Sequence, residues 1–324
     1  MEKLNFKKAV VTGCCGFIGS NLTDRLLQMG IYVTGIDNLS TGQLGFISKA
    51  KQNPKFNFIE GDLTNKSLLN DWFSDHDIVF HISANADIKD GLSQPYRDLE
   101  QNTIVTFNVL EAMRFNNIKK IVFSSTGSVY GEATVIPTPE DAPFPIQTSL
   151  YATSKVCGEG MIQSYCEGYD FQSWIFRFVS ILGERYSHGH VFDFYKQLIN
   201  DGNQLKVLGN GKQKKSYLYI EDCIDAIFFA LNKAKEKVNI FNLGTNEYVQ
   251  VLDSIEVICN HLKVNPKLEF TGGERGWVGD NPFIFLDCSK IRKLGWEPKV
   301  SIRDGINKTL IFLINNNWLI NKRK

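Results

Sequence analysis

A tyrosine and a lysine four positions apart, Tyr151 and Lys155, are the residues of this chain best suited to proton transfer. On a helix this spacing places both side chains on one face, one turn apart. A phenol is a weak base near neutral pH, with an ordinary pKa of about 10. A neighbouring ammonium group favours the phenolate, so we predict that Lys155 lowers the pKa of Tyr151 and that the pair removes a proton from a hydroxyl group. Such pairs also occur by chance on amphipathic helices, so the assignment depends on the rest of the chain.

A glycine-rich segment at residues 12–19 joins the first predicted strand to the first predicted helix. Gly13 permits a tight turn, Gly16 lets the backbone approach a pyrophosphate, and Gly19 allows close packing of the helix on the strand. Backbone N–H groups at the start of the helix then point at phosphate groups. A turn without a ligand is the alternative, but the order strand, glycines, helix favours a dinucleotide site.

Acidic residues follow the second and third predicted strands. Asp37 comes eighteen positions after Gly19 and ends the second strand. A carboxylate there accepts hydrogen bonds from an adenosine ribose and repels a 2′-phosphate, which favours NAD over NADP. Asp62 follows the third strand, where it is placed to receive an adenine amino group or, alternatively, to cap a helix.

Strand and helix signals alternate through the first half of the chain, as a parallel sheet with helices on both faces requires. The periodicity predicts strands at 9–12, 32–36, 56–59, 77–82, 120–124 and 174–179, and helices at 17–29, 99–115 and 149–167. After residue 179 the pattern changes to short strands and to helices predicted at 191–199, 221–231, 251–262 and 302–314. The fold class is therefore α/β, a Rossmann-type doubly wound parallel sheet with a smaller α+β C-terminal substrate lid.

Two discontinuous domains follow from this pattern. We predict that residues 1–180 plus 214–246 bind NAD and that residues 181–213 plus 247–324 hold the substrate. A strand near 240–243 is expected to return to the main sheet.

The composition, 43% hydrophobic and 22% charged with a net charge of +1, is typical of a globular protein and shows no nucleic-acid footprint. Seven cysteines, an odd number without metal-ligand spacing, favour free thiols in a reducing compartment and no metal site. The N-terminus lacks the apolar core of a signal peptide, and the longest late apolar run, 310–314, is too short to span a bilayer. We therefore expect a cytoplasmic protein that binds neither membranes nor nucleic acid.

Taken together, the Gly-x-x-Gly-x-x-Gly spacing and the Tyr-x-x-x-Lys pair resemble the extended short-chain dehydrogenase/reductase family, and more narrowly its nucleotide-sugar epimerases and dehydratases. Further matches lie at 37–40, 81–84, 102, 123–126, 129–131 and 294–298, so the likeness runs from about Lys8 to Pro298. The resemblance implies NAD bound across the sheet and hydride transfer at a sugar carbon. It also implies a nucleotide-diphosphate sugar, GDP- or UDP-linked, held by the C-terminal lid.

The resemblance further implies a role for each matching residue. Tyr151 would deprotonate a sugar hydroxyl, Lys155 would hold the nicotinamide ribose, and Thr126 would orient the substrate oxygen, unless it merely caps a strand end. Besides the three glycines, Asp37, Asp62, Tyr151 and Lys155, the implied cofactor-binding residues are Phe17, Ile18, Asn38, Ser40, Leu63, Ser83, Ala84, Asn102 and Ser124. Besides Thr126, the implied substrate-binding residues are Ser125, Ser180, Arg185, Lys215 and Arg275.

Residues 126–128 discriminate among the reactions of this family. Its sugar 4,6-dehydratases carry an Asp–Glu pair after the Thr, and its decarboxylases usually keep a Glu in this loop. This chain has Gly127 and Ser128 instead, and neither side chain is a general acid near neutral pH. We therefore predict oxidation of a hydroxyl, the one at C4, without elimination and with or without return of the hydride to the other face of the sugar.

Other departures concern the substrate. Ser180 stands where many 4-epimerases have an Asn that contacts the sugar diphosphate. Lys215 stands where relatives often have an Arg, and a lysine can still bind phosphate as a point charge, without the bidentate fork of an arginine. Arg275 resembles the late Arg that clamps the diphosphate. The polar stretch 184–190 is either a solvated loop or part of the site.

As a whole the chain most resembles the dehydrogenases that oxidise C4 of GDP-D-glycero-D-manno-heptose for capsule and other bacterial surface polysaccharides. That likeness predicts a 4-keto sugar and NADH as products, with a 2-keto acid as the candidate second oxidant. A UDP-hexose 4-epimerase is the alternative, and a non-catalytic NAD-binding regulator is a third, disfavoured because Tyr151 and Lys155 are both present. Relatives dimerise through a four-helix bundle, whose counterparts here are the helices at 99–115 and 149–167, so we expect at least a homodimer.

Overall fold

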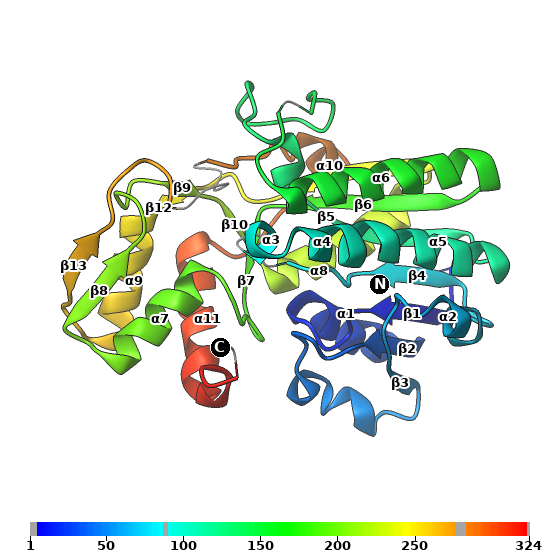
Figure 1. Ribbon diagram of the computed structural model, residues 1–324, viewed down its shortest axis with the longest axis horizontal. Helices are drawn as coiled ribbons and strands as arrows, with labels where there is room; N and C mark the ends of the chain where they lie inside the picture. The colour runs from blue at the N-terminus through cyan, green and yellow to red at the C-terminus, as the bar shows by residue number, and fades with distance from the viewer. Residues whose placement is uncertain (1–4, 87–89, 145, 277–282, 323–324) are drawn as a thin grey trace.

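The computed structural model describes residues 5–86, 90–144, 146–276 and 283–322. At its centre is a seven-stranded sheet with the strand order β11-β6-β5-β4-β1-β2-β3 (Figure 1). Every pairing in this sheet is parallel. The chain builds outward from β1 to β3 and then turns back to add β4 on the other side of β1. Ligands of α/β proteins bind at such a reversal, outside the carboxyl ends of the strands.

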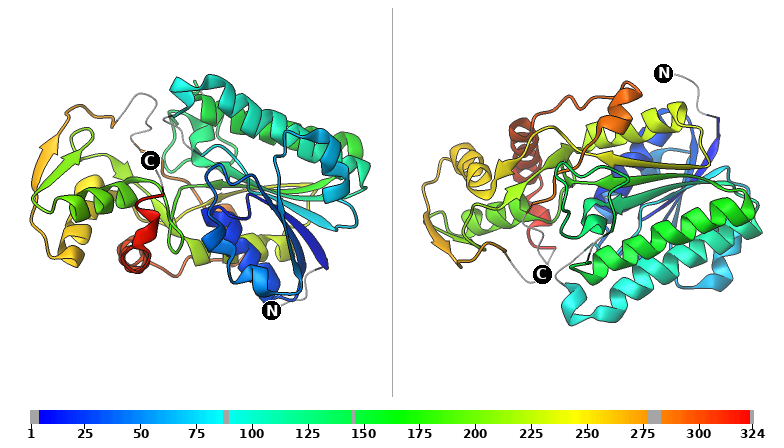
Figure 2. Two further views of the ribbon diagram at one scale, coloured as in Figure 1. Left: turned by 60° about the horizontal axis from the view of Figure 1, so that its bottom comes forward. Right: turned by 90° about the horizontal axis from the view of Figure 1, so that it is seen from above.

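The strands of this sheet are β1 (Lys8–Thr12), β2 (Tyr32–Asp37), β3 (Phe56–Glu60), β4 (Ile78–His81), β5 (Lys120–Thr126), β6 (Gln172–Phe178) and β11 (Val238–Leu243). Helices α1 (Phe17–Gln28) and α8 (Ile220–Lys233) cover one face, and α2 (Lys66–Trp72), α5 (Val105–Phe115) and α6 (Leu150–Tyr169) cover the other (Figure 2).

The central strands are apolar on both faces because each face is covered by helices. In β4, Phe80 is fully buried and packs against Phe228 of α8, with ring centroids 6.2 Å apart. Its neighbour Val79 points to the opposite face and joins the cluster that includes Met113 of α5. The core therefore consists of two layers, one on each side of the sheet.

A second, smaller part of the protein lies beside the carboxyl ends of the strands (Figure 1). It contains the helices α7 (His190–Asn200), α9 (Val251–Leu262) and α11 (Ile302–Asn315). Three two-stranded sheets belong to it, β10-β7 (Tyr217–Tyr219 with Ser180–Leu182), β12-β9 (Val249–Gln250 with Lys214–Lys215) and β13-β8 (Lys267–Phe270 with Gln204–Val207). Outside this part, the short helices α3 (Asp90–Ser93) and α4 (Pro95–Asp98) contact α6, and the short helix α10 (Ser289–Lys293) contacts β11.

The Rossmann-type parallel sheet predicted from the sequence is confirmed, including the return of β11 to its edge. The predicted helix at 99–115 differs in its first part, where Leu99–Ile104 forms a π-helical turn before α5 begins. The exact domain boundaries stay a prediction. Strand β9 falls in the segment 214–246 that was predicted to bind NAD, but it pairs with β12 outside the main sheet. Within the residues described here, no helix has the length and apolar character that crossing a membrane requires.

Candidate active site

A cavity of about 800 Å³ lies between the carboxyl edge of the main sheet and the C-terminal part. This volume falls within the ~300–1,000 Å³ range of small-molecule sites. The predicted site residues that line it are Gly13, Gly16, Phe17, Ile18, Gly19, Asp37, Asn38, Ser40, Leu63, Ser83, Ala84, Ser125, Thr126, Tyr151, Ser180 and Lys215. The fold thus brings the glycine-rich turn and the Tyr151 region to a single cavity.

The glycine-rich turn has the geometry of a phosphate cradle. Gly13 has a φ of +70°, and a Cβ there would lie 2.8 Å from the Cα of Ser83. A Cβ on Gly19 would lie only 2.1 Å from the carbonyl oxygen of Gly13, so the helix could not approach the turn as it does. Helix α1 begins at Phe17 without a side-chain cap, which leaves its first backbone N–H groups for an anion. These residues fit a dinucleotide pyrophosphate.

Asp37 lies at the end of β2, beside this turn. Its carboxylate accepts the backbone N–H groups of Cys15 and Leu39, each at 2.8 Å. Burial is the largest influence on this carboxyl and raises its pKa, against the two hydrogen bonds. The fixed carboxylate is held where the adenosine ribose of NAD is expected, and it lines the cavity.

Asp62 lies in the loop after β3, and its predicted contact with an adenine stays a prediction. Its carboxylate accepts from Asn38 Nδ2 at 2.8 Å and from the Thr64 hydroxyl at 2.7 Å, and the residue does not line the cavity. Asn65, not Asp62, precedes the first residue of α2. In this structure Asp62 holds the loop after β3 against Asn38, which does line the cavity.

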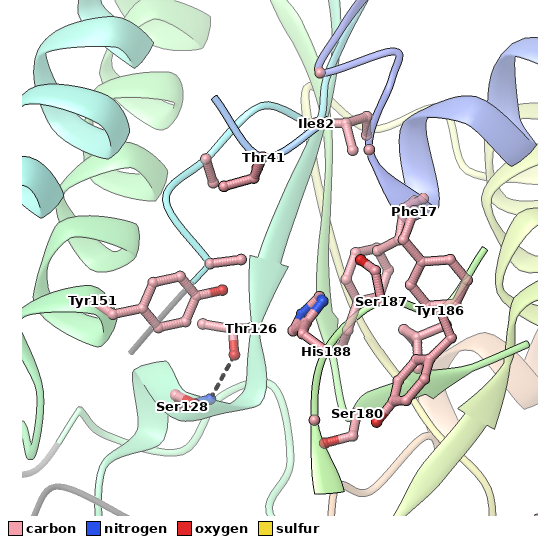
Figure 3. A pocket seen from close by; sticks show the side chains of 18 of the residues that line it. Phe17, Thr41, Ile82, Thr126, Ser128, Tyr151, Ser180, Tyr186, Ser187 and His188 are labelled. Carbon is pink, nitrogen blue, oxygen red and sulfur yellow. Dashed lines mark hydrogen bonds between the residues drawn. The ribbon is translucent and has the colours of Figure 1, made fainter. Parts of the chain in front are cut away.

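Thr126 and Tyr151 meet at the cavity wall (Figure 3). Thr126 ends β5, and its Oγ1 accepts the backbone N–H of Ser128 at 3.1 Å, which caps the short 3-10 turn Gly127–Tyr130. Tyr151 lies in the first turn of α6 and forms a hydrogen bond with Thr126. Thr126 therefore caps this turn and also contacts Tyr151, so the cap does not exclude the predicted role toward a substrate oxygen, which stays a prediction.

Lys155 lies one turn further along α6, behind the cavity wall. Its Nζ donates to the carbonyl oxygen of Ser124 at 2.8 Å and lies over the ring of Phe123, 4.7 Å from its centroid. Burial lowers the pKa of Lys155 to about 7, while the charges of Glu159 and Asp98 act in the opposite direction.

The prediction that Lys155 lowers the pKa of Tyr151 is wrong for this arrangement of the residues. Desolvation raises the pKa of the phenol to about 12, the hydrogen bond with Thr126 lowers it, and the charge of Asp98 raises it further. Lys155 is not among these influences, because its ammonium group is turned to the Ser124 carbonyl. The pairing on one helix face is as predicted, but the orientation of the lysine is not.

Asn102 and Ser124 support the site from behind and do not line the cavity. From the π-helical turn, Asn102 accepts the backbone N–H of Asn85 at 2.8 Å and donates to the hydroxyl of Ser154 at 2.9 Å. It thereby links the loop after β4 to α6. Ser124 donates its hydroxyl to the carbonyl oxygen of His81 at 3.3 Å and accepts from Lys155.

The two arginines predicted to bind substrate are engaged elsewhere. Arg185 forms an ion pair with Asp24 of α1. Arg275 is half exposed and pairs with Glu132. Neither side chain lines the cavity, whereas Ser180 and Lys215 do. Of the three cationic residues predicted to bind substrate, Lys215 therefore lines the cavity and the two arginines do not.

Residues of the loop between β7 and α7 line the cavity, which favours its reading as part of the site over that of a solvated loop. Tyr186, Ser187, His188 and His190 all line the cavity. Tyr186 packs edge-on against Phe17 with centroids 5.7 Å apart, and His188 stacks on Tyr186 at 6.1 Å (Figure 3). The alternation of aromatic, histidine and small residues after Ser180 was the sequence signal for this wall.

Burial lowers the pKa of His190 to about 3, and the charge of Lys215 adds to this effect. The imidazole hydrogen-bonds with the hydroxyl of Tyr217. His190 is therefore a neutral, fixed hydrogen-bonding group beside the cationic Lys215.

The fold and this site define a dinucleotide-binding α/β enzyme of the Rossmann type, with a tyrosine and a threonine hydroxyl at the mouth of its nucleotide cradle. The NAD dependent epimerase/dehydratase family matches residues 9–244, and the chain belongs to that family. It is thus an NAD-dependent enzyme of the extended short-chain dehydrogenase/reductase type.

Two curated relatives show how far the similarity extends. A putative UDP-glucose 4-epimerase of Methanocaldococcus jannaschii is 32% identical over 317 residues, covering 95% of this chain and 99% of the relative. The UDP-glucose 4-epimerase of Mycolicibacterium smegmatis is 32% identical over 315 residues, with the same coverage.

Solved structures agree with the fold. A crystal structure of UDP-galactose 4-epimerase has a TM-score of 0.86 and 33% identity, covering 96% of this chain and 100% of the other. The UDP-glucuronic acid 4-epimerase of Bacillus cereus, in complex with UDP-glucuronic acid and NAD, has a TM-score of 0.88 and 28% identity, covering 95% and 99%.

Proposed function

We propose that the protein oxidises the C4 hydroxyl of a nucleotide-diphosphate sugar to a ketone, without elimination. The observation that carries this proposal is that none of the described residues that line the cavity beside Thr126 has a carboxyl group. Among the described residues that line the cavity, the acidic ones are Asp37 and Asp193. Asp37 belongs to the nucleotide cradle, and Asp193 lies in the first turn of α7.

The space next to Thr126 is also closed to a larger side chain. Ile284 packs against Gly127, where a Cβ would lie 2.8 Å from the Cγ2 atom of the isoleucine. An elimination requires a general acid to protonate the leaving hydroxyl. In this wall an aliphatic side chain occupies the place beside residue 127, so the site is suited to oxidation alone.

The oxidation divides among the residues as follows. Thr126 holds the sugar oxygen beside Tyr151, and Tyr151 takes its proton as the C4 hydride leaves and the C=O bond forms. Bound NAD would supply the hydride acceptor, and the positive charge of its nicotinamide ring would favour the phenolate of Tyr151. Lys155 would hold the nicotinamide ribose, and the cradle around Gly13 would hold the pyrophosphate.

The substrate end supports a nucleotide diphosphate. Lys215 and Lys206 both line the cavity in the C-terminal part and offer positive charge to a diphosphate. A solved relative is described in complex with UDP-glucuronic acid and NAD, which supports a nucleotide sugar in the corresponding place here.

For the particular reaction we propose dehydrogenation of GDP-D-glycero-D-manno-heptose, with the hydride finally passed to a 2-keto acid. Support comes from the overall likeness of the chain and from the polar wall of Ser180, Ser187, His188 and His190, which suits a sugar with hydroxyl groups beyond C6. UDP-hexose 4-epimerisation is the alternative, and the several relatives that are 4-epimerases of UDP sugars support it.

A homodimer through α5 and α6 is also proposed. The two helices lie side by side on one face of the sheet (Figure 2) and are joined by the hydrogen bond from the Tyr165 hydroxyl to Glu111. They leave large apolar side chains exposed, among them Phe115 at 70% and Tyr169 at 46%. Light scattering of the purified protein measures this directly, and a monomeric mass would contradict it.

One incubation experiment tests the reaction. The protein and NAD are combined separately with GDP-D-glycero-D-manno-heptose, UDP-glucose and UDP-galactose, with and without 2-oxoglutarate, and products are identified by NMR and mass spectrometry. We expect a 4-ketone, with repeated turnover only when the keto acid is present. Clean formation of a C4 epimer without added oxidant would favour the alternative, and loss of water from the sugar would contradict the whole proposal.

A further inference from the structure

A buried carboxylate lies one helical turn beyond Lys155, where the proton transfer described above does not use it. Glu159 is 1% exposed and completes, with Tyr151 and Lys155, a row of three residues spaced by four positions on α6. We propose that Glu159 is a positioning residue of the reaction, which keeps Lys155 in its ammonium form and turns the oxygen of Ser125 toward the cavity as an acceptor. The proposal rests on the role given above to Lys155.

The carboxylate is held by two groups from neighbouring strands. Arg177 donates from Nη2 to one oxygen at 2.7 Å and from Nε to the other at 3.1 Å, and both side chains of this pair are at most 3% exposed. The hydroxyl of Ser125 donates to the same carboxylate. Ser125 and Arg177 are register partners on β5 and β6, so the sheet places both on one side of Glu159.

This arrangement defines what Ser125 can offer a ligand. Its single hydroxyl proton is committed to Glu159, while the residue itself lines the cavity. A serine whose proton is used in this way retains only acceptor lone pairs. Ser125 therefore accepts from a sugar hydroxyl next to the one that Thr126 orients.

The second effect of Glu159 is on the charge of Lys155, and every element around the ammonium group contributes. From β5 come the Ser124 carbonyl and the Phe123 ring. From β4 comes His81, which is neutral because burial, with the charge of Lys155, lowers its pKa to about 3. Asp98 comes from α4, and α6 itself carries Tyr151 and Glu159.

Two carboxylates join the Ser124 carbonyl and the Phe123 ring in opposing the loss of the Lys155 proton. Burial lowers the pKa of Lys155 to about 7, and the charge of Glu159 opposes this more strongly than that of Asp98. Arg177 is another cation close to Glu159, and its guanidinium forms an ion pair with that carboxylate. Without the Glu159 charge, Lys155 is expected to be a neutral amine at neutral pH, with a weaker hydrogen bond to the cofactor ribose.

The test is the pH dependence of NAD affinity, measured by calorimetry on the full chain without sugar. The unchanged protein should lose affinity above one midpoint pH, as Lys155 loses its proton. In Glu159→Gln that midpoint should fall by about 1 pH unit or more. The matched control Ser125→Ala removes the hydrogen bond and keeps the carboxylate, so it should show the unchanged midpoint together with a raised KM for the sugar.

A second variant covers the risk to folding. Glu159→Gln leaves the Arg177 guanidinium buried without a counter-charge, whereas Glu159→Gln with Arg177→Gln buries no charge alone. The double variant should keep the fold, seen by circular dichroism, and show a downward shift of the midpoint that is smaller than in Glu159→Gln, because the loss of the Arg177 charge acts in the opposite direction.

The outcomes separate this proposal from the proposed function. An unchanged midpoint in a folded Glu159 variant, or an equal shift in Ser125→Ala, would overturn the positioning role. Failure of both Glu159 variants to fold would assign the residue a structural role and overturn it as well. A failure of the unchanged protein to oxidise any nucleotide sugar would instead contradict the proposed function and leave the NAD midpoints standing.

Discussion

The two ends of the cavity are built by different means. At the nucleotide cradle, backbone positions decide the shape, because Gly13 and Gly19 sit where no Cβ fits. At the substrate end, the wall is made of side chains such as His188 and Lys215, carried by a loop and by short two-stranded sheets. A change of residue at the cradle therefore alters the backbone, whereas a change at the substrate end alters only which groups face the ligand. Such a division lets one family keep its cofactor while its substrates vary.

The largest expected effect falls where the two ends meet. Tyr151→Phe removes the hydroxyl that we propose as the base and keeps the ring, so turnover should fall by about 100- to 10,000-fold. The affinity for NAD should change little, because the cradle is untouched. Turnover with the best nucleotide sugar and calorimetry with NAD measure the two quantities, and unchanged turnover would refute the catalytic assignment.

One added methyl group, at Gly19, is expected to disrupt the cradle. Gly19→Ala places a Cβ 2.1 Å from the Gly13 carbonyl oxygen and should lower the free energy of unfolding by about 1–3 kcal/mol, with a clear loss of NAD affinity. Gly160→Ala is the matched control on α6, where a Cβ would meet nothing within 4 Å. The control should be neutral or stabilising by up to about 1 kcal/mol. Similar thermal melts for both variants would contradict the steric account.

Two histidines, the fully buried His81 and the partly buried His190, lie one at each end and predict a common pH dependence of stability. His81 lies between the hydroxyls of Thr12 and Thr106 near the cradle, and His190 lies beside Lys215. Burial lowers the pKa of each to about 3, against an unfolded value of about 6.5. Between these values the unfolded chain binds more protons, so stability should fall as the pH falls, by about 1.4 kcal/mol per pH unit for each group.

Urea unfolding at pH 7 and pH 4.5 measures this slope. His81→Asn and His190→Asn should each remove the contribution of one histidine, whatever each does to stability at pH 7. A slope that neither variant reduces would place the pH dependence in other groups.

The smallest effect is expected at the substrate wall. His188→Phe keeps a ring to stack on Tyr186 and removes a hydrogen-bonding group from the cavity. The KM for the nucleotide sugar should rise by about fivefold, equivalent to one hydrogen bond of about 1 kcal/mol. NAD affinity should be unchanged. An equal loss of affinity for NAD and for the nucleotide sugar would contradict the separation of the cavity into a nucleotide end and a substrate end.

Much of the fold and the nucleotide end of the site were predictable, because the sequence patterns that specify them extend over only a few residues. Apolar runs of strand length separated by helical periodicity specify a parallel sheet, and a glycine triplet between strand and helix specifies the cradle. The position of Thr126 at the end of β5 follows in the same way, since that edge faces the cavity.

The substrate end was less predictable because its residues depend on distant partners. Arg185 pairs with Asp24, which is 161 positions away, and Arg275 pairs with Glu132, which is 143 positions away. No local sequence pattern indicates either pairing. The buried pair of Glu159 and Arg177 was missed for the same reason, although the spacing of Tyr151, Lys155 and Glu159 was a visible sign.

The sequence alone determined that a tyrosine and a lysine share a helix face and that an NAD cradle precedes them, because helix geometry and glycine sterics act over a few residues. Only the tertiary structure decided where the Lys155 ammonium points and how strongly Tyr151 holds its proton. Both depend on the Ser124 carbonyl, on burial and on charges from other elements, and these come together only when the sheet forms.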